Sequence, residues 1–141
     1  MSFTNYLAQA VLNSIFGKTS ALGALASAPT IWVGLSSTAP TEAGGNITEP
    51  SGGGYARVQT VAADWAAATS ADPSVIANAE TIDFGTASGN WLSLTPLAYV
   101  FFASASSGGN VLAFGALAAS KPVASGDPVY FDPGDLSVSL D

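Results

Sequence analysis

The stretch covering residues 30–57 constrains the fold of this chain more than any other part. Residues 30–35 are β-branched and aromatic, which suits a half-buried strand, and the preceding Pro29 lacks the N–H that a central ladder would use. Serine, threonine, proline, glycine and glutamate then dominate residues 36–54, where no regular element fits. An extended pattern resumes over residues 55–62. The sequence therefore predicts two strands joined by a long irregular loop.

A loop of this length inside a small domain is uncommon, and such loops are usually functional or mobile. A solvated connection is the other interpretation, and the composition does not separate the two. Arg57, the one charged residue in the apolar pattern after the loop, is expected to pair with an acid such as Glu49. The sequence leaves open whether that pair forms inside the protein or across an interface.

The same stretch resembles a family of small bacteriophage virion proteins. The matching pieces read IWVGLS over residues 31–36, TAPT over 38–41 and EPSGGGYARV over 49–58, and the last of these is long enough to be specific. The similarity continues along most of the chain, through residues 82–91, 109–117 and 123–127. Members of the family are labelled as tail fibre, tail or capsid decoration proteins. The resemblance therefore implies a structural virion protein.

Charged residues are scarce in this sequence. They make up 9% of the chain, against roughly 25% in an average soluble protein. The resulting neutral surface suits a subunit that hides surface in an assembly, although a sticky monomer would have the same composition. Ten acids oppose Lys18, Arg57 and Lys121, which gives a net charge of −7. We therefore expect neither direct nucleic-acid binding nor attachment to an anionic membrane surface.

The sequence contains neither cysteine nor histidine, which excludes disulfides, thiolate chemistry, the usual zinc sites and imidazole catalysis. Asp127, Asp132 and Asp135 form the densest acidic group, but each lies beside proline or glycine and is interpreted as a turn former. Glu42 and Glu49 lie in the irregular loop, where a catalytic pair would lack rigid positioning. The sequence therefore predicts no catalytic residue, no metal ligand and no cofactor.

Residues 4–16 have the apolar periodicity of a helix. Its apolar stripe consists of Phe3, Leu7, Val11 and Ile15, with Tyr6, Ala10 and Leu12 beside them. Ser2 or Thr4 can cap the start of this helix, and Gly17 can end it. The stripe can pack against its own domain or dock on a neighbouring subunit. No secretory signal is expected, because no lysine or arginine precedes the apolar part.

The rest of the chain has the pattern of short strands separated by turns. The expected strands are residues 81–84, 91–94, 97–102, 111–117, 129–131 and 136–140, with an edge-like piece at 121–123. Residues 97–102 are apolar on both faces and form the predicted centre of the core, antiparallel to 111–117. Residues 63–79 are ambiguous, because their alanines permit a helix whereas Asp72-Pro73 and the family resemblance favour extended structure.

The predicted fold class is mainly β, an antiparallel β-sandwich or jelly-roll-like domain with one N-terminal α-helix. We expect a single domain over residues 1–141, with the helix and a connector in 1–28 and the β-domain in 29–141. The chain departs from the family pattern at Thr95 and Pro96, where members often carry Thr-His or a similar pair. Because proline removes a ladder hydrogen bond, the next strand is expected to begin late or to bulge.

The function predicted from these observations is that of a structural virion protein without enzymatic activity. A capsid decoration (cement) protein, which binds and stabilises the assembled head, is the first choice. A tail or tail-fibre component is the alternative, although a fibre shaft would normally show repeats and none is present. A polysaccharide-acting enzyme is a third possibility, but it would need a rigid carboxylate pair that the sequence does not evidently supply.

The expected partners are the protein itself, as a homo-oligomer and most simply a trimer, and the major capsid protein or another virion protein. The expected location is the virion, on the capsid surface, after assembly in the host cytoplasm. The candidate partner-contact residues come from the helix stripe and from the loop with its following strand: Phe3, Tyr6, Leu7, Val11, Ile15, Glu49, Tyr55 and Arg57.

Overall fold

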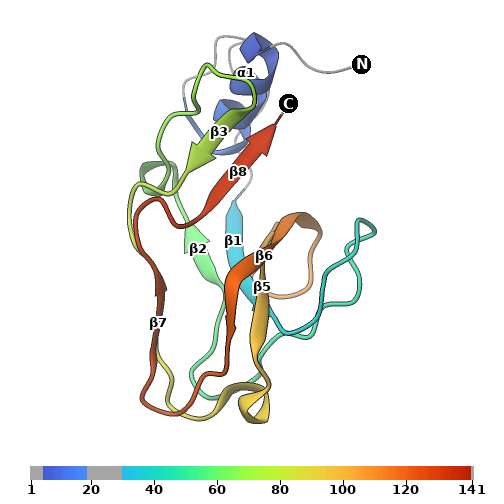
Figure 1. Cartoon of the computed structure of the whole chain (residues 1–141), viewed down its shortest axis with the longest axis vertical. Coiled ribbons are helices and arrows are strands. Elements are labelled where there is room, and N and C mark those ends of the chain that lie inside the picture. The colour runs from blue at the N-terminus through green and yellow to red at the C-terminus, as the bar shows by residue number, and fades with distance from the viewer. Residues whose placement is uncertain (1–4, 19–29, 141) are drawn as a thin grey trace. The chain divides into compact units, whose positions relative to one another are not determined.

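The computed structural model describes residues 5–18 and 30–140, with side chains from Gln9 onward. The elements in chain order are α1 (Asn5–Ile15), β1 (Ile31–Ser36), β2 (Val58–Thr60), the 3-10 helix η1 (Ala62–Asp64), β3 (Ser74–Ala77), β4 (Ile82–Thr86), the 3-10 helix η2 (Trp91–Leu94), β5 (Leu97–Ala103), β6 (Val111–Lys121), β7 (Pro128–Phe131) and β8 (Ser137–Leu140) (Figure 1). The pairs β1–β5, β5–β6 and β3–β8 are antiparallel. The prediction of a mainly β, antiparallel fold with one N-terminal helix is confirmed.

The described residues group into two compact units. The first contains α1, Thr60–Ile82 and the C-terminal part from Phe131, and the second contains Ile31–Gln59 and Asp83–Tyr130. Each unit is therefore built from several segments of the chain. Whether the two fold together as the single domain expected from the sequence stays a prediction.

In the first unit, α1 lies against β3 and β8 (Figure 1). The ring of Phe16 meets the buried Trp65 edge-on, with the ring centroids 4.3 Å apart. Two polar helix side chains bind the backbone of Ala68: Gln9 Nε2 donates to its carbonyl oxygen at 2.9 Å, and Asn13 Oδ1 accepts from its N–H at 2.9 Å. The helix thus completes the hydrogen bonding of an irregular segment as well as covering apolar surface.

The predicted helix is confirmed, but its buried face differs in part from the predicted stripe. Ala10, Leu12 and Phe16 are buried, whereas Val11 is half-buried and Ile15 is exposed. The helix ends as expected at Gly17, whose φ of 70° lets the N–H of Lys18 reach the carbonyl oxygen of Asn13 at 2.7 Å. Ser2, Phe3 and Thr4 lie outside the described residues, as do the side chains of Tyr6 and Leu7. α1, the one α-helix among the described residues, is not long and apolar enough to cross a membrane.

A buried asparagine holds the turn before β8 in the first unit. Asn78 donates through Nδ2 to the carbonyl oxygens of Glu80 and Asp132, at 2.9 and 2.8 Å, and its Oδ1 accepts from the N–H groups of Gly134 and Leu136. The carboxylate of Asp135 accepts the N–H of Asp132 at 3.0 Å.

Two of the three acids predicted to form turns, Asp127 and Asp135, do so through their carboxylates. Asp135 closes the turn before β8, and Asp127 accepts the N–H of Ala124 at 3.0 Å in the turn before β7. Their interpretation as turn formers is confirmed.

The second unit is organised around a four-stranded sheet in the order β2–β1–β5–β6. β5 lies between β1 and β6, as predicted for the centre of the core, and Phe101 on β5 is fully buried. Gly34 on β1 is the register partner of Phe101, and a Cβ at Gly34 would lie 2.4 Å from Cζ of that ring. The absence of a side chain at Gly34 therefore leaves the space that the Phe101 ring occupies across β1.

Two predicted strands of the second unit are wrong in extent or type. The strand expected over residues 55–62 is reduced to β2, because the preceding residues are held by side-chain contacts instead of a ladder. Residues 91–94 form η2, with positive φ at Leu92, Ser93 and Leu94, instead of a strand. The cause is tertiary: the N–H of Trp91 donates to the carbonyl oxygen of Val123 at 3.0 Å, and its buried side chain turns the segment inward.

Other details follow the sequence more closely. After Thr95 and Pro96, β5 begins only at Leu97, and its register against β6 shifts before Tyr99, so the expected late or bulged start is confirmed. Residues 63–79 form η1, irregular structure and β3, which agrees with the extended interpretation. The edge-like piece at 121–123 is corrected, because Lys121 is the last residue of β6 and Val123 is buried.

The close approach at Gly34 gives a direct test of this core. Gly34→Ala is expected to lower the free energy of unfolding by about 1–3 kcal/mol, because the added methyl group overlaps the Phe101 ring. Urea denaturation measures the change. Gly45→Ala is the control, since its Cβ would meet only Thr41 Oγ1 at an ordinary 3.6 Å. Equal stability of the two variants would contradict the packing described for β1 and β5.

Candidate functional site

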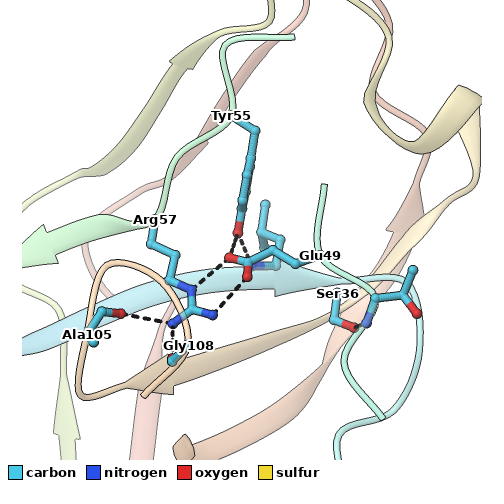
Figure 2. Close-up of polar contacts among 8 residues, drawn as sticks. Ser36, Glu49, Tyr55, Arg57, Ala105 and Gly108 are labelled. Atoms are coloured by element: carbon cyan, nitrogen blue, oxygen red, sulfur yellow. Dashed lines mark hydrogen bonds and ion pairs between the residues drawn. The ribbon is translucent and has the colours of Figure 1, made fainter. Parts of the chain in front are cut away.

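The candidate site is centred on an ion pair between Arg57 and Glu49 in the second unit. Arg57 Nε donates to Glu49 Oε1 at 2.8 Å, and Nη2 donates to Oε2 at 2.8 Å (Figure 2). The Arg57 side chain is 6% exposed and that of Glu49 is 22% exposed. A planar, two-point pairing of this kind is among the strongest polar contacts in proteins. The pair expected from the sequence is confirmed, and it forms inside the protein.

Arg57 also binds the loop between β5 and β6. Its Nη1 donates to the carbonyl oxygens of Ala105 and Gly108, at 2.9 and 2.8 Å, from the side opposite Glu49 (Figure 2). The guanidinium carbon lies 4.9 Å from the centroid of the Phe101 ring, within the range of a cation–π contact. One side chain thus joins the irregular loop, the central strand and the β5–β6 loop. The hydrogen bonds to Glu49 raise the pKa of Arg57 above its usual value, which means that they stabilise its cationic form.

Tyr55 shares the carboxylate of Glu49. Its hydroxyl donates to Glu49 Oε1 at 2.6 Å and accepts the N–H of Leu35 at 3.0 Å, which ties the site to β1 (Figure 2). Its ring stacks on Phe84, with centroids 6.0 Å apart, and meets the edge of Trp91 at 5.1 Å. Burial, and after it the hydrogen bond to Glu49, raises the pKa of Tyr55 well above its usual value.

The glycine run at residues 52–54 positions Tyr55. All three glycines have positive φ, at 76°, 61° and 81°, which side chains rarely allow. A Cβ at Gly53 would also lie 2.8 Å from the carbonyl oxygen of Gly89. The close approach lets Trp91 Nε1 donate to the carbonyl oxygen of Gly53 at 2.8 Å, so the turn is anchored directly beside the Tyr55 ring.

The irregular loop before the glycine run is held by its own hydrogen bonds. Ser36 Oγ donates to the carbonyl oxygen of Thr38 at 2.7 Å and accepts the N–H of Thr48 at 3.0 Å. Thr38 Oγ1 donates to the carbonyl oxygen of Asn46 at 2.6 Å, and the N–H of Ser37 donates to the carbonyl oxygen of Thr48 at 3.0 Å. The loop has no helix or strand, as predicted, but these bonds fasten its two ends to each other.

The structure brings together the three candidate contact residues Glu49, Tyr55 and Arg57, which lie far from α1 in the chain. Val11 and Ile15 belong to α1 in the first unit, and the side chains of Phe3, Tyr6 and Leu7 lie outside the described part. A partner-contact role for all eight residues stays a prediction. Sequence reasoning missed the carbonyl groups of Ala105 and Gly108, because a backbone acceptor leaves no residue signature, and it missed the aromatic enclosure of Tyr55.

The polar groups of this cluster bind one another and so stabilise the structure of the second unit. Both carboxylate oxygens of Glu49 accept hydrogen bonds, the Tyr55 hydroxyl donates and accepts, and Arg57 contacts two segments besides Glu49. Together with the antiparallel sheet, this cluster defines a small β protein in which polar contacts of an irregular loop maintain the shape of the unit.

The comparison with known families agrees with this class. The model of the family Podophage GP4 fiber I protein gp80 matches residues 2–139, and the chain belongs to this family. The resemblance to small phage virion structural proteins is thereby confirmed. No curated protein matches the chain.

The Arg57–Glu49 pair can be tested by removing one charge. Glu49→Gln is expected to lower the free energy of unfolding by about 3 kcal/mol, because Arg57 would keep a nearly buried charge without its partner. Glu42→Gln is the matched control, since Glu42 is an exposed acid of the same loop, and it should change stability by less than about 0.5 kcal/mol. Equal effects of the two variants in urea denaturation would show that the pair does not hold the fold.

The buried hydroxyl of Tyr55 is expected to lower the free energy of unfolding in alkaline solution. Its pKa is higher in the folded protein than in the unfolded chain, where it is about 10, so its contribution is complete below that pH and falls as the pH rises further. The fall should reach about 1.4 kcal/mol per pH unit for one proton. Above about pH 10, the free energy of unfolding should fall less steeply with pH for Tyr55→Phe than for the wild type or for the exposed control Tyr130→Phe. Parallel curves for all three proteins would refute the assignment.

Proposed function

We propose that the protein is a structural component of a phage fibre. The observation that carries this proposal is the match of the fiber I family over residues 2–139, which covers nearly the whole chain. The match shows that the chain belongs to a family of phage virion structural proteins. The description of that family favours the fibre as the place of this protein in the virion. The tail-fibre component, one part of the alternative named from the sequence, falls within this proposal.

The geometry of the second unit supports a role that depends on shape. The irregular loop, the β5–β6 loop and the central strand are fastened to one another through Arg57, so the surface that they form is fixed before any partner arrives. Preorganised surfaces lose less conformational entropy on association. Exposed apolar side chains of this unit, including Leu94, Leu112 and Phe114, provide area that a neighbour can bury.

A structural role also agrees with the state of the polar groups. In the candidate site the carboxylate of Glu49 and the hydroxyl of Tyr55 are bound to protein groups, so neither is offered to a substrate. We therefore propose that the protein acts by assembly and not by catalysis. Its proposed partners are further copies of itself, for which a trimer is the simplest expectation, and other proteins of the virion.

Capsid decoration, the first choice from the sequence, differs from this proposal in location and in partner. It would place the protein on the head surface with the major capsid protein beneath it. The low charge of the chain suits both assemblies equally, and the family description supports the fibre.

Immunogold electron microscopy of intact particles separates the two locations. Antibodies raised against the purified chain are expected to label fibres and leave the head surface unlabelled. Preimmune antibodies on the same particles give the background. Gold over the head with none on the fibres would overturn the fibre proposal and restore the decoration role.

A further inference from the structure

The outer strand of the four-stranded sheet, β6, has a long edge without a neighbouring strand among the described residues. β6 lies at the edge of the sheet, and among the described strands it is hydrogen-bonded only to β5. It has 11 residues, whereas β2 at the other edge has 3. An edge strand leaves backbone N–H and C=O groups without ladder partners, and natural edges are usually protected by charges or proline. Residues 111–120 contain neither.

The outward face of β6 is apolar. Burial alternates along residues 111–118, and Leu112 and Phe114 on the exposed face are 45% and 42% exposed. Ala116 and Ala118 continue that face. The chain as a whole carries a net charge of −7, but this strand has no carboxylate, so two copies can approach along it without placing acids of the strand against each other.

Gly115 at the middle of β6 has no role in the packing of its own chain. A Cβ at this position would meet no atom within 4 Å, and its φ is not in the left-handed region. Gly34 is the contrast, since the Phe101 ring fills the place of its Cβ. Glycine weakens the interior of a strand, so this residue does nothing to stabilise β6 within its own chain.

The sequence around Gly115 is complementary to itself. If two β6 strands run antiparallel about a two-fold axis at Gly115, each large side chain faces a small one. Phe114 then faces Ala116 of the second copy, Leu117 faces Ala113, and Leu112 faces Ala118. Alternation of large and small residues across facing positions allows close packing.

We propose that the β6 edge of one copy pairs antiparallel with the β6 edge of a second copy, centred on Gly115. The register of β6 against β5 shifts on both sides of residues 113–116, so the regular ladder is short. A contact of this size belongs with the small, weak interfaces. The β6–β6 pairing therefore forms at the millimolar effective concentrations that neighbouring copies reach in an assembly. The pairing does not depend on the fibre proposal, because it is tested in solution and the location is tested on particles.

Sedimentation equilibrium of the full chain, extended to millimolar concentration, tests the pairing. The expected result is an even number of copies: a dimer, or a hexamer if a three-fold contact also forms. A protein that stays monomeric, or that stops at a trimer, overturns the proposal.

Two substitutions test whether the β6 edge makes this contact. Phe114→Glu is expected to raise the dissociation constant of the pair at least about tenfold, because it places a carboxylate against apolar surface. Tyr130→Glu makes a similar change at an exposed aromatic residue of β7 and should leave the dissociation constant unchanged. If Phe114→Glu pairs as tightly as Tyr130→Glu, the edge is not the contact.

Gly115→Val separates pairing from folding. A β-branched residue fits the isolated strand, where nothing occupies the position, so the melting temperature at low concentration should be equal to or above that of the wild type. Pairing should be strengthened at the same time, because β-branched side chains that face each other across two antiparallel strands contact one another, whereas two glycines do not. A dissociation constant equal to or above that of the wild type overturns the proposal, and this test holds even if Phe114→Glu does not fold.

The register can be read by cross-linking, since the native chain has no cysteine. Ala113→Cys and Leu117→Cys face each other only in the register centred on Gly115. A mixture of the two variants should form disulfide-linked pairs under mild oxidation much faster than either variant alone. Equal rates for the mixture and for the single variants would exclude this register.

Discussion

The second unit depends on the pairing of Arg57 with Glu49. An arginine side chain that is 6% exposed has lost most of its hydration, and only an acid with well-placed oxygens can offset that cost. Glu49 supplies both oxygens, and the carbonyl groups of Ala105 and Gly108 accept the two hydrogen bonds from Nη1. Since a buried ion pair adds little net stability over apolar packing, its main effect is geometric. It selects one arrangement of two loops and a strand from the many that a glycine-rich and serine-rich chain would otherwise allow.

Tyr55 extends this selection to the aromatic core. Its hydroxyl joins the carboxylate of Glu49 to the backbone of Leu35, and its ring lies between Phe84 and Trp91. The polar and apolar parts of the unit therefore meet in a single side chain. Removal of the ring and removal of the hydroxyl would have different consequences, because the first opens the core and the second leaves a buried carboxylate with one partner fewer.

The extent to which sequence predicted this arrangement differs between residues for physical reasons. Arg57 and Glu49 were paired correctly because an isolated charge in an apolar strand needs an acid, and the stretch 49–58 also carried the family resemblance that the match over residues 2–139 confirms. Strand β5 was predicted correctly because an uninterrupted apolar run is typical of a strand that is buried on both faces. The turn at residues 91–94 was missed, since its cause is a hydrogen bond from Trp91 to Val123. Local propensity depends on neighbouring residues and cannot predict a partner so distant in the sequence. The buried face of α1 was predicted in part: Ala10 and Leu12 are buried as expected, whereas Ile15 is exposed. The contacts of Gln9 and Asn13 with the backbone of Ala68 leave no trace in the apolar periodicity.

The division of the chain into two units has a consequence for how such a protein can change. The chain passes between the units at residues 30–31, 59–60, 82–83 and 130–131, so no continuous stretch of the gene encodes either unit by itself. A single recombination event cannot exchange one unit for a foreign one, nor can a simple deletion remove it. Point substitutions and changes in the lengths of surface loops remain the simplest ways in which one unit can vary without the other.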